Sequence, residues 1–247
     1  LSRILLARVR PAWLRDPGIA RAEAAKRGRP ILVICAAGEP DAPVNPSAWK
    51  FIHVTLQDKA FVKSLNESFV LLWHDLYAAC GGETAYDVRL DGEFPEEELV
   101  LCDEGSDQMM LNMLICHPDG GVRHAVCGWW PADLLRAECG KAATWALGTQ
   151  EDAARAREGA LARLHADIAK LAASGAGDPS VEHQVGVLKT LTRRYASYAG
   201  SKVGLALDAA LAEADEDFRG RELRESGDIV LEGEIQEAPA PDGEPAK

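Results

Sequence analysis

The chain has 247 residues, 47% of them hydrophobic and 27% charged, and its formal net charge is −12. This composition is typical of a soluble globular protein with one large domain, or with one ordinary domain and an appendage. No apolar run approaches the roughly 20 residues that cross a bilayer. The excess of acidic residues repels phosphate backbones and anionic lipids, so we expect neither a nucleic-acid partner nor membrane association.

The sequence leaves the cellular compartment open. Residues 1–10 carry three arginines and are more typical of a short amphipathic helix than of a signal sequence, which favours the cytoplasm. A cleaved signal peptide remains an alternative.

The first third of the chain predicts helices alternating with strands. Asp16 and Pro17 begin a helix that ends near Gly28, and residues 31–37 form an unbroken apolar run. Such a run predicts a strand that is covered on both faces of a sheet. Asn45 is placed to cap a helix that begins at Pro46 and runs through Leu56. Two further segments follow, a helix over 58–67 and a strand over 69–76.

The middle of the chain predicts a β-hairpin followed by a helix. Residues 78–108 are mostly polar and acidic, whereas residues 109–116 and 122–127 are predicted to form two strands. Pro118, Asp119 and Gly120 between them supply the residues of a tight turn. A helix is expected to follow, from about residue 131 to 145.

After residue 149 the sequence predicts helices without strands. Helical segments are expected over 151–173, from about 178 to 198, and over 202–217, arranged as a helical hairpin or as three helices. The prediction therefore has three parts: a sheet domain over 1–148, a helical appendage over 149–218, and a flexible acidic tail over 219–247.

The order of elements resembles the thioredoxin fold in its shorter form, which lacks the first strand. The segment Ala24–Val33 is similar to the family's entry to its central strand, and Leu56–Val70 is similar to a signature of thioredoxin-like and UAS-type domains. The resemblance covers residues 12–146. It implies a central sheet with flanking helices, and a pair of cysteines at the start of the helix after the first strand.

The chain departs from the family at that pair. The four positions of the redox motif fall on Asn45, Pro46, Ser47 and Ala48, and the family's cis-proline position falls near Leu111. The redox reaction needs one thiolate activated at a helix N-terminus and a second thiol one turn later. We therefore expect a degenerate site without catalytic residues, in which Ser47 only bonds a free backbone N–H of the first turn.

The six cysteines leave a second interpretation open. They stand at positions 35, 80, 102, 116, 127 and 139, and no two are closer than eleven residues. Most are expected to be small buried side chains, although a distant pair such as Cys80 with Cys102 is conceivable. The alternative function is that of a thiol–disulfide oxidoreductase, or another thiol-dependent enzyme, that uses these dispersed cysteines.

Histidines and tryptophans supply the remaining candidates. Four of the six histidines, at 53, 74, 117 and 124, are candidate ligands, but they form no close-spaced motif, so we expect no metal site. A metal- or small-ligand-binding protein is the second alternative. Trp129 and Trp130 are a possible recognition surface. The leading hypothesis is a thioredoxin-like protein without redox activity or cofactor, which binds a protein partner or forms a homo-oligomer.

Overall fold

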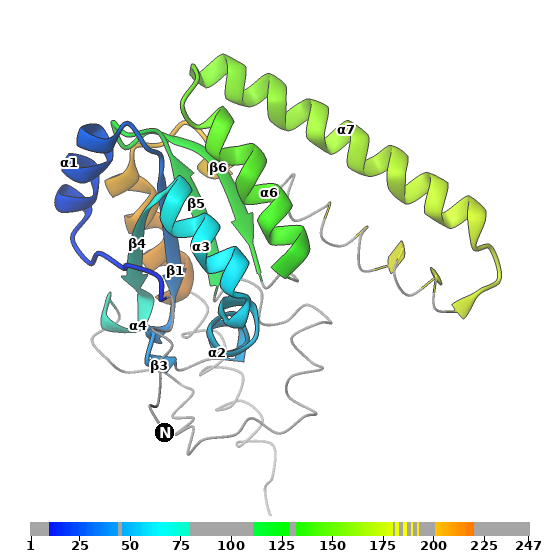
Figure 1. Ribbon diagram of the computed structural model, residues 1–247, viewed down its shortest axis with the longest axis horizontal. Helices are drawn as coiled ribbons and strands as arrows, with labels where there is room; N and C mark the ends of the chain where they lie inside the picture. Colours follow the sequence, from blue (N-terminus) through cyan, green and yellow to red (C-terminus); the bar gives the residue numbers. More distant parts are fainter. Residues whose placement is uncertain are drawn as a thin grey trace, which may run out of the picture.

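The computed structural model describes residues 10–43, 46–79, 111–128, 132–179 and 201–219, together with 181–182, 185–186, 189 and 192. Its centre is a four-stranded mixed sheet in the order β4-β1-β5-β6, with helices on both faces (Figure 1). The predicted α/β class, with a central sheet and flanking helices, is confirmed.

β1 (Ile31–Ala36) lies inside the sheet and pairs on both sides. It runs parallel to β4 (Val70–Asp75) and antiparallel to β5 (Leu111–Cys116), and β6 (Val122–Cys127) pairs antiparallel with β5. All six residues of β1 are buried, which agrees with the unbroken apolar run that predicted it. The expected hairpin is also present, with Gly120 at a positive φ of 95° in its turn.

One face of the sheet, called here the α3 face, is covered by helices that follow β1 and β6. They are α2 (Pro46–His53), the 3₁₀ turn η1 (Thr55–Gln57), α3 (Lys59–Ser68) and α6 (Ala132–Trp145). Their buried side chains form one cluster with alternate residues of the strands; its large members are Phe51, Phe61, Leu65, Trp73, Met113 and Leu135.

The helix expected to run from Pro46 through Leu56 is interrupted. α2 stops at His53, and a short 3₁₀ turn leads into Asp58. The carboxylate of Asp58 accepts hydrogen bonds from the backbone N–H groups of Ala60 and Phe61, at 2.9 and 3.0 Å. This cap begins a new helix in a new direction, so the apolar residues of α2 and α3 both reach the sheet.

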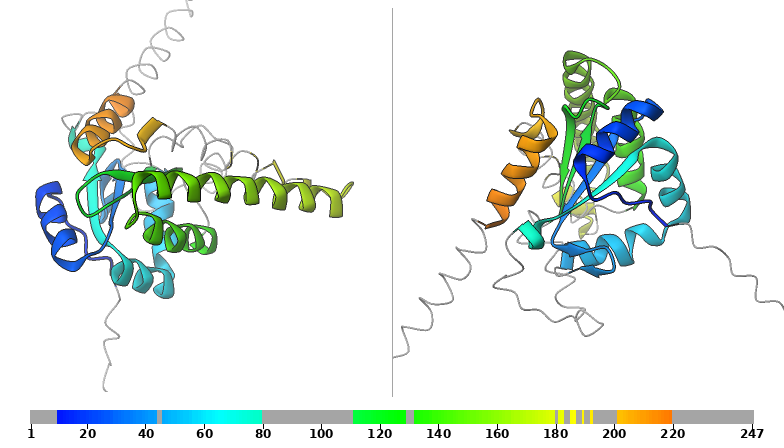
Figure 2. Two further views of the ribbon diagram at one scale, coloured as in Figure 1. Left: turned by 90° about the horizontal axis from the view of Figure 1, so that it is seen from above. Right: turned by 90° about the vertical axis from the view of Figure 1, so that its left-hand side faces the viewer.

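The opposite face, called here the α1 face, is covered by two helices from the two ends of the chain. α1 (Pro17–Arg27) begins at Asp16, whose carboxylate accepts from the backbone N–H of Ile19 at 2.7 Å, and ends at Gly28 with φ 62°. The other helix comprises residues 207–219. Figure 2 shows it on the side of the sheet opposite α3 and α6, in its right-hand view.

The helix over 207–219 differs from its prediction in start and in place. The sequence predicted a helix over 202–217 in an appendage outside the sheet domain, yet residues 207–218 contribute five side chains to the core beside β1, β4, β5 and β6. The helix starts late because Gly204 has a φ of 100° and Ala206 forms a bridge with Gly121. An amphipathic helix pattern shows which face is buried but not what it is buried against.

α7 (Gln150–Ser174) is the longest described helix and extends away from the sheet (Figure 2). The side chain of Thr149 caps its first turn, accepting from the backbone N–H of Asp152 at 3.1 Å. Beyond Gly175, the described residues 181–182, 185–186, 189 and 192 are helical. Among the described residues, no helix is long and apolar enough to cross a membrane.

Short elements cap the end of the sheet where β1 and β4 finish. β2 (Gly38–Glu39) and β3 (Ala42–Pro43) form a small hairpin after β1, and α4 (Leu76–Ala79) follows β4. The indole N–H of Trp73 donates to the carbonyl oxygen of Gly38 at 2.9 Å, and the Asp75 carboxylate accepts from the Gly38 N–H at 2.8 Å. These bonds fix the direction in which the chain leaves β1.

Candidate functional site

Two of the positions at which the resemblance places a redox site belong to the same core cluster. Ala48, in α2, and Leu111, the first residue of β5, are both fully buried in the cluster of the α3 face. Leu111 pairs with Ala36, the last residue of β1, and its carbonyl oxygen accepts from the N–H of Gly128 at 2.7 Å. At these two positions the end of the sheet is packed with apolar side chains.

The remaining predicted site residues are described only in part. Pro46 and Ser47 form the first turn of α2, and only their backbone is described. Asn45, Trp129 and Trp130 lie outside the described residues, as do Cys80 and Cys102. The expected recognition surface at the two tryptophans therefore stays a prediction.

The four cysteines within the described residues are free and buried. Burial raises the pKa of Cys116 and of Cys139 to about 12. Burial is also the main cause that raises the pKa of Cys35, and the charge of Asp215 and the thiol of Cys116 add to it against an opposing effect of Lys202. At neutral pH these three thiols are protonated, so they are poor nucleophiles.

A row of polar and sulfur-bearing side chains crosses the sheet on the α1 face. Cys35 pairs with His74 on one side and with Asn112 on the other, and Asn112 pairs with Cys127. Because side chains alternate along a strand, His74 shares the face of Leu72, which belongs to the core cluster of that face. The rest of that core is almost entirely apolar, which makes this row its most polar part.

The helix over 207–219 brings a carboxylate to this row. Asp215 Oδ1 lies 2.7 Å from Nε2 of His74, and both side chains are largely buried. A cysteine, a histidine and a carboxylate thus lie near one another, as they do in thiol hydrolases. The Cys35 thiol is nevertheless completely buried and its pKa is raised, so it is protonated at neutral pH.

A second buried ionisable group lies inside the C-terminal segment, defined here as residues 201–219. Lys202 Nζ is 2.7 Å from Glu213 Oε2 and 3.0 Å from Asp217 Oδ2, and the Lys202 side chain is only 5% exposed. Burial acts to lower the pKa of Lys202, but its hydrogen bonds and charge interactions with the two carboxylates outweigh burial and raise it. The start of the segment is thereby tied to the far turn of its helix.

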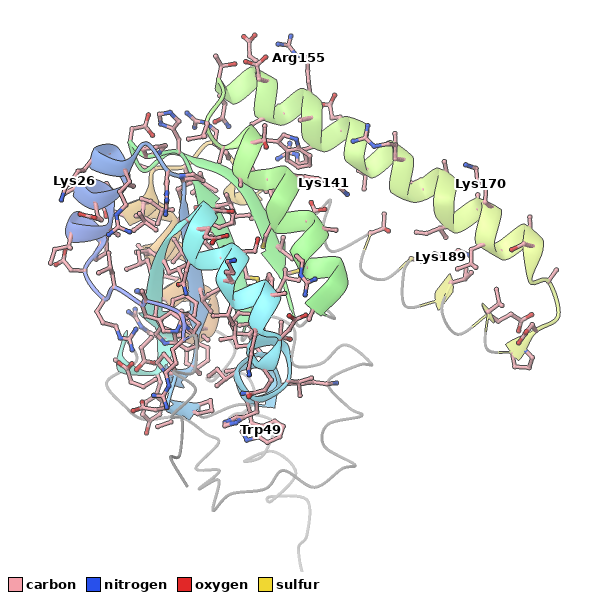
Figure 3. All side chains as sticks on the ribbon, viewed as in Figure 1. Lys26, Trp49, Lys141, Arg155, Lys170 and Lys189 are labelled. Carbon is pink, nitrogen blue, oxygen red and sulfur yellow. The ribbon has the colours of Figure 1, made fainter. Side chains whose placement is uncertain are left out.

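The three other histidines singled out in the sequence lie apart from this row. His53 stacks on Trp49 of the same helix with ring centroids 4.8 Å apart, and Figure 3 shows Trp49 at the end of the molecule formed by α2. His117 accepts from the N–H of Asp119 in the hairpin turn, at 3.2 Å. His124 is buried under α6, 3.1 Å from a carboxylate oxygen of Glu138. No group of three or more metal-ligating side chains occurs in the part of the chain that the structure describes.

Comparison with known proteins finds no relative of this chain. No family model, no curated protein and no solved structure matches the chain significantly.

Sequence reasoning missed the His74–Asp215 contact and the ion-pair group at Lys202. Leu207, Leu211, Ala214 and Phe218 stand at helical spacing, so the sequence does signal a buried helix face. The sequence does not indicate that this helix face packs against the central sheet, whose strands end more than 70 residues earlier in the chain.

Proposed function

We propose that this chain is a thioredoxin-like protein that has lost its redox site and serves as a protein-binding or scaffolding module. The resemblance implies a central sheet with flanking helices and a hairpin that turns at Pro118 to Gly120. The four-stranded mixed sheet, its antiparallel β5–β6 hairpin and the helices on both of its faces agree with that implication. The β2–β3 hairpin between β1 and α2 is a departure from the resemblance, because it makes the chain before the helix several residues longer than usual.

The observation that carries the loss of redox function is the alanine side chain at position 48, which has no thiol to resolve a mixed disulfide. A resolving thiol would occupy this position, and here a fully buried methyl group packs in the core of the α3 face. The described cysteines elsewhere offer no substitute, because they are buried and the pKa values of Cys35, Cys116 and Cys139 are raised. These facts favour the binding role over the thiol-enzyme alternative.

A thiol–disulfide exchange assay tests the loss of the redox site. Reduction of insulin disulfides in the presence of dithiothreitol should proceed at the uncatalysed rate with the wild-type chain. The double variant Asn45→Cys/Ala48→Cys should form a reducible disulfide and accelerate the reaction, because it restores two thiols one helical turn apart. The matched control is Lys50→Cys/His53→Cys, with the same spacing at the other end of α2.

Each arm of this assay has an outcome against the proposal. Catalysis by the wild-type chain would overturn the non-catalytic role. A restored pair that forms no disulfide in the folded double variant would remove the thioredoxin-like assignment of α2. The binding role is tested separately by sedimentation of two samples of the intact protein. One is purified to homogeneity, and the other is isolated under mild conditions that keep bound proteins attached. A monomer without a stoichiometric partner in both samples contradicts the binding role.

A further inference from the structure

A nearly neutral arm extends from an acidic body. α7 leads away from the sheet and, with the helical residues described between 181 and 192, belongs to an extension called here the arm, residues 150–192 (Figures 1 and 2). The sequence of the arm has five Lys and Arg residues and six Asp and Glu residues, so its net charge is −1, and the rest of the chain carries −11 of the total of −12. Bodies of like charge repel each other, so a contact between two copies is most favourable far from the body.

An open groove of about 390 Å³ lies near the tip of the arm, and its lining includes Ala172 of α7 and Gly186 of the helical stretch that follows. Two glycines of the groove have different surroundings. A methyl group built on Gly175 would lie within 2.6 Å of the Val181 side chain, so packing inside the arm requires glycine there. A methyl group built on Gly186 meets no atom within 4 Å. Since glycine weakens a helix, its presence at 186 is explained by the close approach of a second backbone rather than by packing within the chain.

Two opposite charges flank Gly186 in the groove. Glu182 and Lys189 both line it, and the three residues share one face of the helical stretch because their spacing is i, i+4, i+7. All three are exposed, and Figure 3 shows Lys189 on the stretch that returns beside α7. Among the described residues, no ion pair involves Glu182 or Lys189. They stand about 10 Å apart along the helix axis, too far to pair with each other.

We propose that this groove binds the same groove of a second copy of the chain, with the two helical stretches antiparallel. A twofold axis close to Gly186 then places Glu182 of each copy opposite Lys189 of the other, so one charge pattern forms two ion pairs. Gly186 lies between the two pairs, where the backbones approach most closely. This inference rests on the proposed binding role and names its partner.

Charge selects the antiparallel direction and tolerates the acidic bodies. A parallel pair would place Glu182 opposite Glu182 and Lys189 opposite Lys189, which is repulsive at both ends. In the antiparallel pair the two bodies lie at opposite ends of the contact. Ala172, in the groove, is 22 residues from the start of α7, or about 33 Å along the helix, which is several times the Debye length of about 8 Å at physiological ionic strength. Repulsion between the bodies is therefore largely screened.

Charge reversal in the full chain tests the contact. Glu182→Lys gives a groove with two basic residues, and Lys189→Glu gives one with two acidic residues. Each variant alone places like charges at both contacts of its own dimer, whereas a mixed dimer of the two variants has opposite charges at both. The double variant Glu182→Lys/Lys189→Glu reverses the pattern and keeps it self-complementary, so it is the matched control. Both positions are exposed, so these substitutions leave the fold intact.

Analytical ultracentrifugation over a range of concentrations, with one of the two variants carrying a dye, gives the dissociation constants. The wild type should form a reversible dimer with a dissociation constant that is roughly micromolar or weaker, because the contact is small. Each single variant should dimerise at least about tenfold more weakly, and their equimolar mixture and the double variant should dimerise as the wild type does. A wild type that is monomeric up to about 1 mM overturns the proposal, and so does a dimer that both single variants form equally well.

Gly186→Gln tests the close approach separately. The new side chain has room within the chain but occupies the space at the twofold axis, so the dimer should weaken at least about tenfold while the helical circular dichroism is kept. Ala166→Gln, at an exposed position of α7 that does not line the groove, is the control and should dimerise as the wild type does. Equal dimerisation of the two variants overturns the proposal.

The failure of this inference is distinct from the failure of the proposed function. A monomeric wild type that carries a different protein, released by Gly186→Gln, would assign the groove to that protein and overturn self-association, yet it would preserve the binding role. A dimer that none of these variants weakens would likewise preserve the binding role and remove the groove from it. The insulin assay is indifferent to both results, so the loss of the redox site stands in either case.

Discussion

His74, near the end of β4, and Asp215, in the helix over 207–219, lie 2.7 Å apart through Nε2 and Oδ1 although 141 positions separate them in the chain. The contact joins the last described helix to a strand of the first third of the sequence. It lies beside Cys35, which is paired with His74 in the parallel register of β1 and β4. The contact therefore fixes the helix over the most polar part of the α1 face.

Removal of this contact should loosen the helix over 207–219. We expect Asp215→Ala to lower the free energy of unfolding by about 1–3 kcal/mol, since a largely buried hydrogen-bonding group of His74 loses its partner. Arg21→Ala, which breaks the more exposed pair with Asp208, should cost less than about 1 kcal/mol. Chemical denaturation gives both values, and amide hydrogen exchange shows whether the loss is confined to 207–219. Equal effects of the two variants would contradict the difference in burial.

Phe218 tests whether the same helix is part of the core. Its side chain is 2% exposed in the cluster of the α1 face, so Phe218→Ala should destabilise the protein by about 3–5 kcal/mol. Ala212→Ser, on the exposed side of the same helix, is the control and should change stability by less than about 0.5 kcal/mol. A Phe218→Ala variant that unfolds at the wild-type denaturant concentration would show that the helix is an appendage after all.

The described thiols should be inert until the protein unfolds. Burial raises the pKa of Cys116 and Cys139 to about 12 and also raises that of Cys35, so few thiolates exist at pH 8 and reagents cannot reach them. Alkylation with iodoacetamide followed by peptide mapping should find these three sites unmodified in the native protein and fully modified in guanidinium. Rapid native modification at any of them would revive the interpretation of a thiol enzyme at that residue.

The sequence was sufficient to predict the sheet. Buried strands such as β1 consist of apolar runs bounded by turn residues, and the turn residues Pro118 to Gly120 define the hairpin without any distant information. Local capping also carries enough signal, because Asp16 caps α1 as predicted. These features depend on interactions between residues close in sequence.

The place of the C-terminal helix was beyond the sequence because it depends on tertiary contacts. The apolar stripe from Leu207 to Phe218 is compatible with a helical appendage as much as with the sheet. The sequence also gives no reason for the helix to start after Gly204. The reason is the backbone pairing of Gly204 and Leu205 with Val122 at the edge of the sheet. The burial of Ala48 is similar: its spacing marks the position, whereas its packing with the cluster around Phe51 depends on the assembled fold.

Asp58 should make stability depend on pH in the acid range. Its hydrogen bond from the Phe61 N–H is the largest cause that lowers its pKa from 3.8, and Arg136 lowers it further. A lowered pKa means that the carboxylate contributes stability above the unfolded value of 3.8 and that this contribution is lost as the pH falls through the folded value. The difference in melting temperature between wild type and Asp58→Asn should therefore shrink below pH 3.8.

Arg136→Gln separates the two causes at Asp58. This variant removes the ion pair between α6 and α3 and leaves the cap of α3 in place. Because the hydrogen bond from the Phe61 N–H is the largest single cause, Arg136→Gln should retain part of the acid-range dependence that Asp58→Asn loses. Loss of the whole dependence in Arg136→Gln would show that the ion pair, not the cap, holds the pKa down.

Two glycines with free space around them should respond to alanine in opposite directions. A methyl group built on Gly28 or on Gly140 meets no atom within 4 Å, so packing is the same for both. Gly28 ends α1 with a φ of 62°, where alanine is strained, and Gly28→Ala should cost about 1 kcal/mol or more. Gly140 lies inside α6, and Gly140→Ala should instead add about 0.5–1 kcal/mol because it lowers the entropy of the unfolded chain. Urea unfolding of both variants measures the two signs, and a gain at Gly28 would contradict the left-handed end of α1.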